Sequence, residues 1–393
     1  MSPKKTIHSR SRKIETVLTH AGRSPGENRG YVNTPVYRGS TIVFPTLDAL
    51  ESTEPRFDYG RTGNPSSAAV EELVSELEHA AGTVLAPSGL SAISLALLTV
   101  LGSGDEVLIT DSAYQPTRRV SDGVLTRMGI KVVYYDPRIA NIATLVTPRT
   151  KAIFVESPGS LTFEIQDLRA ISAIAAPRQI AVIVDNSWAT PLYHHPLDLG
   201  ADIVVHAGTK MFVGHSDVMF GTASANEKWW GALLDTHRRL GLCASPDDCF
   251  LAARGLRTLA LRMQEHSTRS TAIAAWLELQ PDVRKVLHPA LPSHPDHTLF
   301  KRDFSAPGSL FSLELSPKPR AALAAMVDGL ELFGMGWSWG GYESLCLPIN
   351  PGKIRTAVPW TDPGPMLRLH IGLEDIDDLK ADLSAALARY RAA

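Results

Sequence analysis

The stretch DNSWATP at positions 185–191, followed by HAGTKMFVGHSD at 206–217, decides the fold. Each of these polar segments directly follows an apolar run, IAVIVD (180–185) or DIVVHA (202–207). Short apolar runs that end in turn residues are typical of strands buried on both faces of a parallel sheet. The sequence therefore predicts that both polar segments lie at the carboxyl edge of such a sheet.

Four similar runs precede these two along the chain. They are TVLA (83–86), EVLIT (106–110), KVVYY (131–135) and KAIFVE (151–156). Most of the runs are about 20 to 30 residues apart, which suits a strand, a crossover helix and a parallel strand. Val70, Leu73, Val74 and Leu77 share one face of a predicted helix before the first run. We therefore predict an α/β fold, mainly a parallel sheet with helices on both faces.

The pattern changes after about residue 256. Strand-like runs at 309–315 and 366–372, a helix-like run at 320–333 and a final amphipathic helix with Ile376, Leu379, Leu383 and Leu387 predict a smaller α+β domain. The first 60 residues have little apolar content and are expected to pack on something else. The predicted organisation is an arm at 1–60 that contacts a neighbouring subunit, an α/β domain at 61–256 and the α+β domain at 257–393.

Composition excludes several classes of partner. The 39 Lys+Arg and 41 Asp+Glu give a net charge of -2, without the cationic excess that nucleic acids or anionic membranes attract. Three cysteines are too few for a disulfide framework, which favours a reduced, cytoplasmic compartment. The stretch 85–101 is too interrupted by polar residues to span a membrane. The basic residues 1–13 predict a solvated tail, with a short transit segment as the alternative.

Distinctive groups follow several strand ends, and the carboxyl ends of parallel strands meet at one edge. Individually, Lys210 suits a solvated turn, Asp185 a helix cap, Tyr114 a packing position and Ser88–Gly89 a strand-to-helix turn. Together they offer a lysine amine that condenses with an aldehyde, a carboxylate for a ring cation, an aromatic face for stacking and a helix N-terminus for phosphate. Pyridoxal 5'-phosphate (PLP) requires all four.

Other ligands are not expected. GSGDEV (102–107) lacks the spacing of a dinucleotide-binding loop. No paired cysteines or H-E-x-x-H spacing accompany the histidines, so we expect structural histidines and no metal. This expectation covers His194, His195, His206 and His215.

Eight segments resemble the cysteine and methionine metabolism family of PLP enzymes, of fold type I, and the resemblance runs from about Glu15 to the C-terminus. They are YGRTGNPS (59–66), SGLSA (88–92), DSAYQPT (111–117), ESPGS (156–160), DNSWATP (185–191), VGHSD (213–217), RGLRTL (254–259) and GWSWGGYESL (336–345). Trp339 and ESPGS are similar to the branch that performs β-elimination rather than to the γ-acting branches.

The resemblance implies a role for each matching residue. Lys210 would hold the cofactor and move protons, Asp185 would contact the pyridine nitrogen, and Tyr114 would stack on the ring and act near the leaving group. Phosphate would be bound by the backbone of Gly89 and Leu90, with Thr209 helping, and by Tyr59 and Arg61 of a neighbouring subunit. Arg368, assisted by Ser338 and beside Trp339, would bind the substrate carboxylate. A homo-oligomer follows, at least a dimer and by resemblance a tetramer.

The expected function is therefore a PLP-dependent β-elimination that cleaves L-cystathionine to homocysteine, pyruvate and ammonia. Three alternatives remain open from the sequence. They are a cysteine desulfhydrase-like lyase, a γ-acting lyase or synthase, and a catalytically silent PLP-binding regulator.

Overall fold

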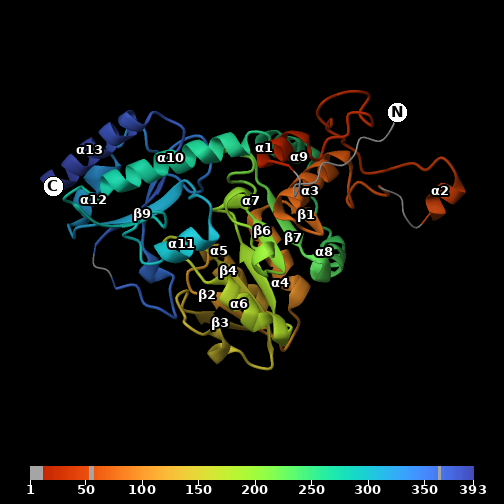
Figure 1. The fold of residues 1–393 in the computed structure, drawn as a ribbon, viewed down its shortest axis with the longest axis horizontal. Coiled ribbons are helices and arrows are strands. Elements are labelled where there is room, and N and C mark those ends of the chain that lie inside the picture. Colours follow the sequence, from red (N-terminus) through yellow and green to blue (C-terminus); the bar gives the residue numbers. More distant parts are fainter. Residues whose placement is uncertain (1–11, 53–56, 362–363) are drawn as a thin grey trace.

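The structure is a computed structural model that describes residues 12–52, 57–361 and 364–393. The basic tail expected at 1–13 therefore lies almost wholly outside the described residues. Two sheets organise the chain, a seven-stranded one with order β1-β7-β6-β5-β4-β2-β3 and a four-stranded one with order β10-β11-β9-β8. Figure 1 shows them side by side, with the long helix α10 (Leu259–Leu277) running along the smaller sheet towards the larger one.

The larger sheet confirms the predicted fold class. Its strands are β1 (Gly82–Ala86), β2 (Glu106–Thr110), β3 (Lys131–Tyr135), β4 (Thr150–Glu156), β5 (Ala181–Asp185), β6 (Ile203–His206) and β7 (Gly221–Ala225). Strands β3, β2, β4, β5 and β6 pair in parallel, and each of the six expected runs contains one strand. The sequence missed β7, which pairs antiparallel with both β1 and β6.

The sequence did not predict strand β7, because its sequence, GTASA, contains only one β-branched residue, Thr222, and no aromatic residue. Small residues are needed there by the packing. A Cβ on Gly221 would lie 2.2 Å from the carbonyl oxygen of Ser88, the residue that caps α4 (Gly89–Val100). The small strand thus lets the N-terminus of α4 approach the sheet closely.

Helices cover the larger sheet. They are α3 (Pro65–Glu78), α4, α5 (Gln115–Val120), α6 (Leu168–Ala175), α7 (Thr190–Tyr193), α8 (Glu227–Leu240) and α9 (Pro246–Leu256). Asn64 begins α3 by accepting hydrogen bonds from the N–H groups of Ser66 and Ser67, with a proline at the first helical position. The predicted apolar face of α3 is fully buried.

The smaller sheet is antiparallel throughout. Its strands are β8 (Val283–Leu287), β9 (Leu310–Leu315), β10 (Leu345–Ile349) and β11 (Met366–His370), accompanied by α10, α11 (His297–Asp303), α12 (Arg320–Val327) and α13 (Ile376–Ala392). Strands β8 and β10 were not expected. The two sheets fall within residues 82–225 and 283–370. The domain boundaries themselves stay a prediction.

The helix expected at 320–333 ends early, at Val327. The carboxylate of Asp382 on α13 accepts hydrogen bonds from the backbone N–H groups of Glu331, Leu332 and Phe333. These N–H groups therefore donate to a side chain instead of to the carbonyl groups of a continuing helix. The periodicity of the sequence does not reveal this competition, because the acceptor lies about 50 residues away.

The N-terminal arm divides into two parts. Val17 and Leu18 on α1 (Ile14–His20) are buried in a cluster with residues of α3 and α10. Beyond it, Tyr31, Val43 and Leu47 are exposed, and α2 (Leu47–Glu51) projects from the rest of the chain in Figure 1. The contact of the arm with a neighbouring subunit stays a prediction. Among the described helices, none has both the length and the apolar character needed to cross a bilayer.

Asp111, directly after β2, ties the segment between β10 and β11 to the larger sheet. Its carboxylate accepts hydrogen bonds from the N–H groups of Thr356 at 3.0 Å, Ala357 at 3.1 Å and Val358 at 2.8 Å, and from Arg118. Burial raises the pKa of Asp111, but these donors outweigh it and the pKa is lowered. A carboxyl with a lowered folded pKa stabilises the fold at neutral pH, and this contribution is lost as the pH falls through that pKa.

We predict that Asp111→Asn destabilises the protein by about 2 kcal/mol at pH 7, because the amide removes the charge and turns a donor toward the N–H groups that the carboxylate binds. Urea unfolding at pH 7 would measure the loss, and the difference from the parent should shrink as the pH is lowered. Asp235→Asn is the matched control, since Asp235 pairs with Arg239 on an exposed helix surface and should leave the midpoint unchanged. Equal midpoints for the parent and Asp111→Asn would contradict the prediction.

Candidate active site

The candidate site is built from strand ends of the larger sheet and one loop of the smaller one. Asp185 ends β5, Lys210 follows β6 and Tyr114 follows β2, as expected from the sequence. The loop containing Ser338 precedes β10, and Arg368 lies on β11. Both sheets therefore contribute side chains to one place.

Ser338 joins the two sheets. The Lys210 Nζ donates to the Ser338 Oγ over 2.6 Å, and the Arg368 Nη2 donates to the Ser338 carbonyl oxygen over 2.9 Å. Ser338 has a φ of 78°, a left-handed conformation that is uncommon outside glycine. This backbone conformation accompanies the presentation of the hydroxyl to one cation and of the carbonyl to the other.

The amine of Lys210 is prepared to act as a nucleophile or base. Burial and the nearby Arg368 lower its pKa to about 8, while Asp185 opposes the shift. An ordinary lysine with a pKa of about 10.4 is almost entirely protonated at neutral pH. Lys210 therefore has a much larger unprotonated fraction, which is the form that attacks an aldehyde or removes a proton.

Arg368 is buried but has unused donors. Burial lowers its pKa to about 10, against a smaller opposing effect of Tyr114, so it remains a cation at neutral pH. Among the described residues the only hydrogen bond of its guanidinium is the one from Nη2 to the Ser338 carbonyl oxygen. A guanidinium with free N–H groups in a buried place suits a carboxylate, which it binds through two parallel hydrogen bonds.

The loop next to Ser338 packs tightly on Lys210. Gly340 has a φ of +91°, and a Cβ there would lie 3.0 Å from each of three Lys210 atoms. Beneath the loop, the Nε2 atom of His370 lies 3.2 Å from the Gly340 nitrogen and 3.0 Å from the Gly341 oxygen. In either tautomer the ring bonds to this loop, so His370 holds it against the lysine.

Asp185 lies on the other side of the site. Its Oδ1 atom accepts hydrogen bonds from the backbone N–H of Ser187 at 2.9 Å and from the Ser187 hydroxyl at 2.6 Å. Burial raises its pKa, and the two Ser187 donors lower it only in part. No donor among the described residues reaches Oδ2, so a ring cation placed there would favour the ionised carboxylate.

A helix N-terminus completes the arrangement. Gly89 and Leu90 are the first two residues of α4, so their N–H groups have no acceptor within the helix. A Cβ on Gly89 would lie 2.5 Å from the Cβ of Ala207, which brings this N-terminus against the segment that leads to Lys210. Thr209 directly precedes Lys210. Its hydroxyl accepts a hydrogen bond from the Phe220 backbone N–H and donates one to the Phe220 carbonyl oxygen. Binding phosphate through Thr209 would require that bond to be exchanged.

Tyr114 is positioned by a residue to which the sequence assigned no role. The Glu156 Oε2 atom accepts the backbone N–H of Tyr114 over 2.7 Å. Burial, followed by the charges of Glu156 and Asp185, raises the pKa of the Tyr114 hydroxyl, so it is neutral at physiological pH. Burial and Asp185 also raise the pKa of Glu156 well above its usual range. The stacking role expected for Tyr114 stays a prediction.

Of the remaining predicted residues, one lies near Lys210 and two do not. The ring centroid of Trp339 lies 5.6 Å from the Lys210 Nζ, so this residue joins the cluster. Tyr59 and Arg61 pack on each other and Arg61 donates to the Arg238 carbonyl oxygen over 3.0 Å. Neither contacts Lys210, Asp185 or Tyr114 within the described part of the chain. This is compatible with the predicted role toward a neighbouring subunit but does not test it.

Comparison with known proteins identifies relatives over nearly the whole chain. Residues 15–388 match the family described as Cys/Met metabolism PLP-dependent enzyme. The cystathionine beta-lyase MetC of Escherichia coli is 40% identical, covering 96% of this chain and 99% of that protein. An L-alanine/L-glutamate racemase of Wolbachia pipientis is 38% identical, covering 96% and 97%.

Solved structures agree in fold. A cystathionine gamma synthase of Xanthomonas oryzae, in complex with aminoacrylate and cysteine, has a TM-score of 0.89 and 33% identity, covering 97% of this chain and 99% of that one. The residues described above fit PLP, because a lysine of lowered pKa, a carboxylate with a free oxygen and a helix N-terminus with free N–H groups meet at one edge.

We predict that the recombination rate of the cofactor-stripped protein with PLP rises with pH to a midpoint near 8, the pKa of Lys210, because only the free amine reacts. Arg368→Gln should move this midpoint upward, since it removes a cation that disfavours protonation of the lysine. Stopped-flow absorbance would follow the reaction. Arg284→Gln on β8 is the control and should leave the midpoint unchanged. A parent midpoint near that of an ordinary lysine would contradict the prediction.

Proposed function

We propose that this chain, which belongs to the Cys/Met metabolism family of PLP-dependent enzymes, is a carbon–sulfur β-lyase that cleaves L-cystathionine to homocysteine, pyruvate and ammonia. One observation carries the proposal most directly. Ser338 holds a lysine of lowered pKa and a buried arginine with free donors on the same residue. A base and a carboxylate-binding group are thereby positioned for one amino-acid substrate.

Bound PLP supplies an electron-withdrawing ring that stabilises negative charge at the substrate Cα. The residues of the chain supply the rest. Arg368 would bind the substrate carboxylate and so orient the Cα–H bond. The Asp185 carboxylate would keep the pyridine nitrogen protonated, which maintains the electron demand of the ring.

Lys210 would move the protons. Its amine would take the proton from Cα, the Cβ–S bond would break, and the lysine would return a proton to the departing sulfur to release homocysteine as a thiol. The remaining three-carbon enamine takes up water and gives pyruvate and ammonia. The neutral Tyr114 hydroxyl would be available as a hydrogen-bond donor near the leaving group.

Related reactions start with the same proton transfer. The named relatives include a racemase, and the structural neighbours include a gamma synthase, so removal of the Cα proton does not by itself identify the reaction. The E. coli relative, named as a cystathionine beta-lyase, and Trp339 beside Lys210 favour β-elimination here. A γ-acting lyase or synthase is the second candidate.

We also propose a homo-oligomer in which Tyr59 and Arg61 of one subunit reach the phosphate of another. Tyr59 is 46% exposed, and Tyr31, Val43, Leu47 and Leu50 of the arm are exposed as well. An arm of this composition is expected to be covered. Two subunits would then be the smallest complete unit, and a tetramer would be a pair of such dimers.

Incubation of the purified holoenzyme with L-cystathionine, followed by mass spectrometry of the keto acid, tests the reaction. We expect pyruvate in amounts equal to the homocysteine released. The appearance of 2-oxobutyrate instead would assign γ-elimination and overturn the proposal. Turnover of neither kind would favour a racemase or a binding role, which a chiral assay with alanine and glutamate would distinguish.

Lys210→Ala should lower kcat by about 10³-fold or more, because the same amine serves as base and acid. The variant should also lose the visible absorbance of cofactor linked to the protein. Lys151→Ala is the matched control, since Lys151 is an exposed lysine on β4, and it should turn over normally. Full activity in Lys210→Ala would exclude the mechanism.

Arg368→Lys should raise KM by about 10- to 100-fold with a smaller effect on kcat, because a lysine keeps the charge but loses the paired hydrogen bonds to the carboxylate. Steady-state kinetics with cystathionine would measure both constants. An unchanged KM would show that another group binds the carboxylate.

A further inference from the structure

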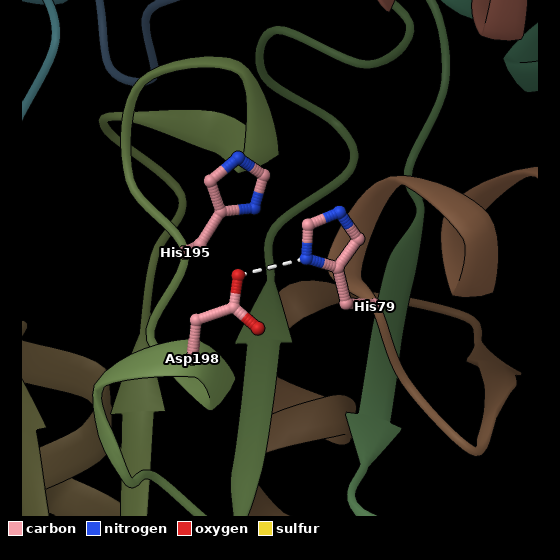
Figure 2. Close-up of side chains that lie close together, drawn as sticks. All are labelled: His79, His195 and Asp198. Carbon is pink, nitrogen blue, oxygen red and sulfur yellow. Dashed lines mark hydrogen bonds and ion pairs between the residues drawn. The ribbon is translucent and has the colours of Figure 1, made fainter. Parts of the chain in front are cut away.

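Three potential metal ligands lie together outside the candidate active site. His79, His195 and Asp198 each offer one ligand atom, and these atoms lie within 4.8 Å of one another. Figure 2 shows the two rings and the carboxylate gathered around a common space. His79 ends α3, whereas His195 follows α7 and Asp198 lies in the short helical turn Leu197–Leu199.

The ligand atoms lie near enough for small side-chain movements to form a zinc site. The His79 Nδ1 atom is already 2.8 Å from the Asp198 Oδ2 atom. Zinc bonds to nitrogen and oxygen of about 2.1 Å in tetrahedral geometry place ligand atoms about 3.4 Å apart. The largest separation, 4.8 Å, therefore has to shorten by about 1.4 Å, which side-chain torsions can supply.

The backbone presents the ligands from two directions. His79 has a φ of 56°, the left-handed conformation that ends α3 and turns the chain away from the helix. The two imidazole rings are parallel within 1°, with centroids 4.8 Å apart. Their contact therefore brings the end of α3 next to the segment that follows α7.

One ligand atom lacks an explanation in the protein alone. The His195 Nδ1 atom is buried and has no hydrogen-bond partner among the described residues. Buried polar atoms are nearly always satisfied, and an exception often marks a bound ion or water. The hydrogen bond between His79 and Asp198 accounts for two members of the cluster, but it leaves this nitrogen unused.

The types of ligand atom suit a transition metal. Two imidazoles and one carboxylate favour zinc and similar transition metals over magnesium or calcium, which prefer oxygen ligands alone.

We propose that His79, His195 and Asp198 bind a divalent transition-metal ion of the zinc class, with water as a fourth ligand. The ion would join the C-terminus of α3 to the segment 194–198. Its position is distinct from the candidate active site, because none of the three ligands contacts Lys210, Asp185 or Arg368 within the described residues. The role that follows from this geometry is a structural cross-link.

The proposal is tested by zinc binding to the holoenzyme carrying Cys243→Ser, which removes the exposed thiol that could bind zinc independently. After treatment with a chelator, equilibrium dialysis against buffered free Zn²⁺ and elemental analysis should find one site per chain. His195→Gln and Asp198→Asn should each weaken this site by about tenfold or more. His20→Gln, an exposed histidine at the end of α1, should retain it. Absence of zinc from the parent overturns the proposal. So does zinc binding in both ligand variants that is as tight as in the parent.

A second measurement separates metal binding from a general loss of stability. Each protein is compared with itself, with and without saturating Zn²⁺, and the PLP absorbance verifies that the variant is folded. The parent and His20→Gln should gain about 3 °C in thermal midpoint, whereas His195→Gln and Asp198→Asn should gain none. Equal gains in all four proteins would show that zinc acts elsewhere and would overturn the proposal.

Discussion

The rest of the site depends on two cations held by one serine. Lys210 and Arg368 both bond to Ser338, so their positive charges lie near each other. Burial disfavours the protonated amine of Lys210, and the like charge of Arg368 adds to this effect. The lowered pKa of Lys210 is the outcome, and it gives the amine its reactivity near neutral pH.

Such an arrangement is costly unless anions complete it. The carboxylate of Asp185 acts from one side, and a cofactor phosphate at the N-terminus of α4 and a substrate carboxylate at Arg368 would add two more. The whole-chain charge of -2 conceals this local cationic crevice. Its position between two sheets also explains why Asp111 matters, because that carboxylate ties the segment at 356–358 to the larger sheet.

The histidines illustrate how burial divides one residue type by role. His194, His288 and His370 are buried, and burial lowers their pKa to about 3, so they are neutral packing or hydrogen-bonding groups. The sequence assigned no role to His288 and His370 and expected a structural histidine at His194. His195 was placed in the same class. The structure brings His195 next to His79, 116 positions away in the chain, and leaves its Nδ1 atom without a hydrogen-bond partner among the described residues. The metal proposal departs from the sequence expectation for that reason.

The sequence by itself determined the features that depend on local pattern. Apolar runs long enough to cross a sheet predicted six strands of the larger sheet, and polar residues at their ends predicted the placement of Asp185, Lys210 and the Gly89 turn, because the carboxyl ends of parallel strands share one edge. Tertiary structure alone decided β7, whose small residues carry no strand signal, and β8 and β10, which the sequence pattern did not reveal. It also decided that Ser338 unites Lys210 with Arg368 and that His79 meets His195. The Lys210–Ser338 and His79–His195 contacts join residues more than 100 positions apart, and the geometry that selects them arises only when the chain packs into its tertiary structure.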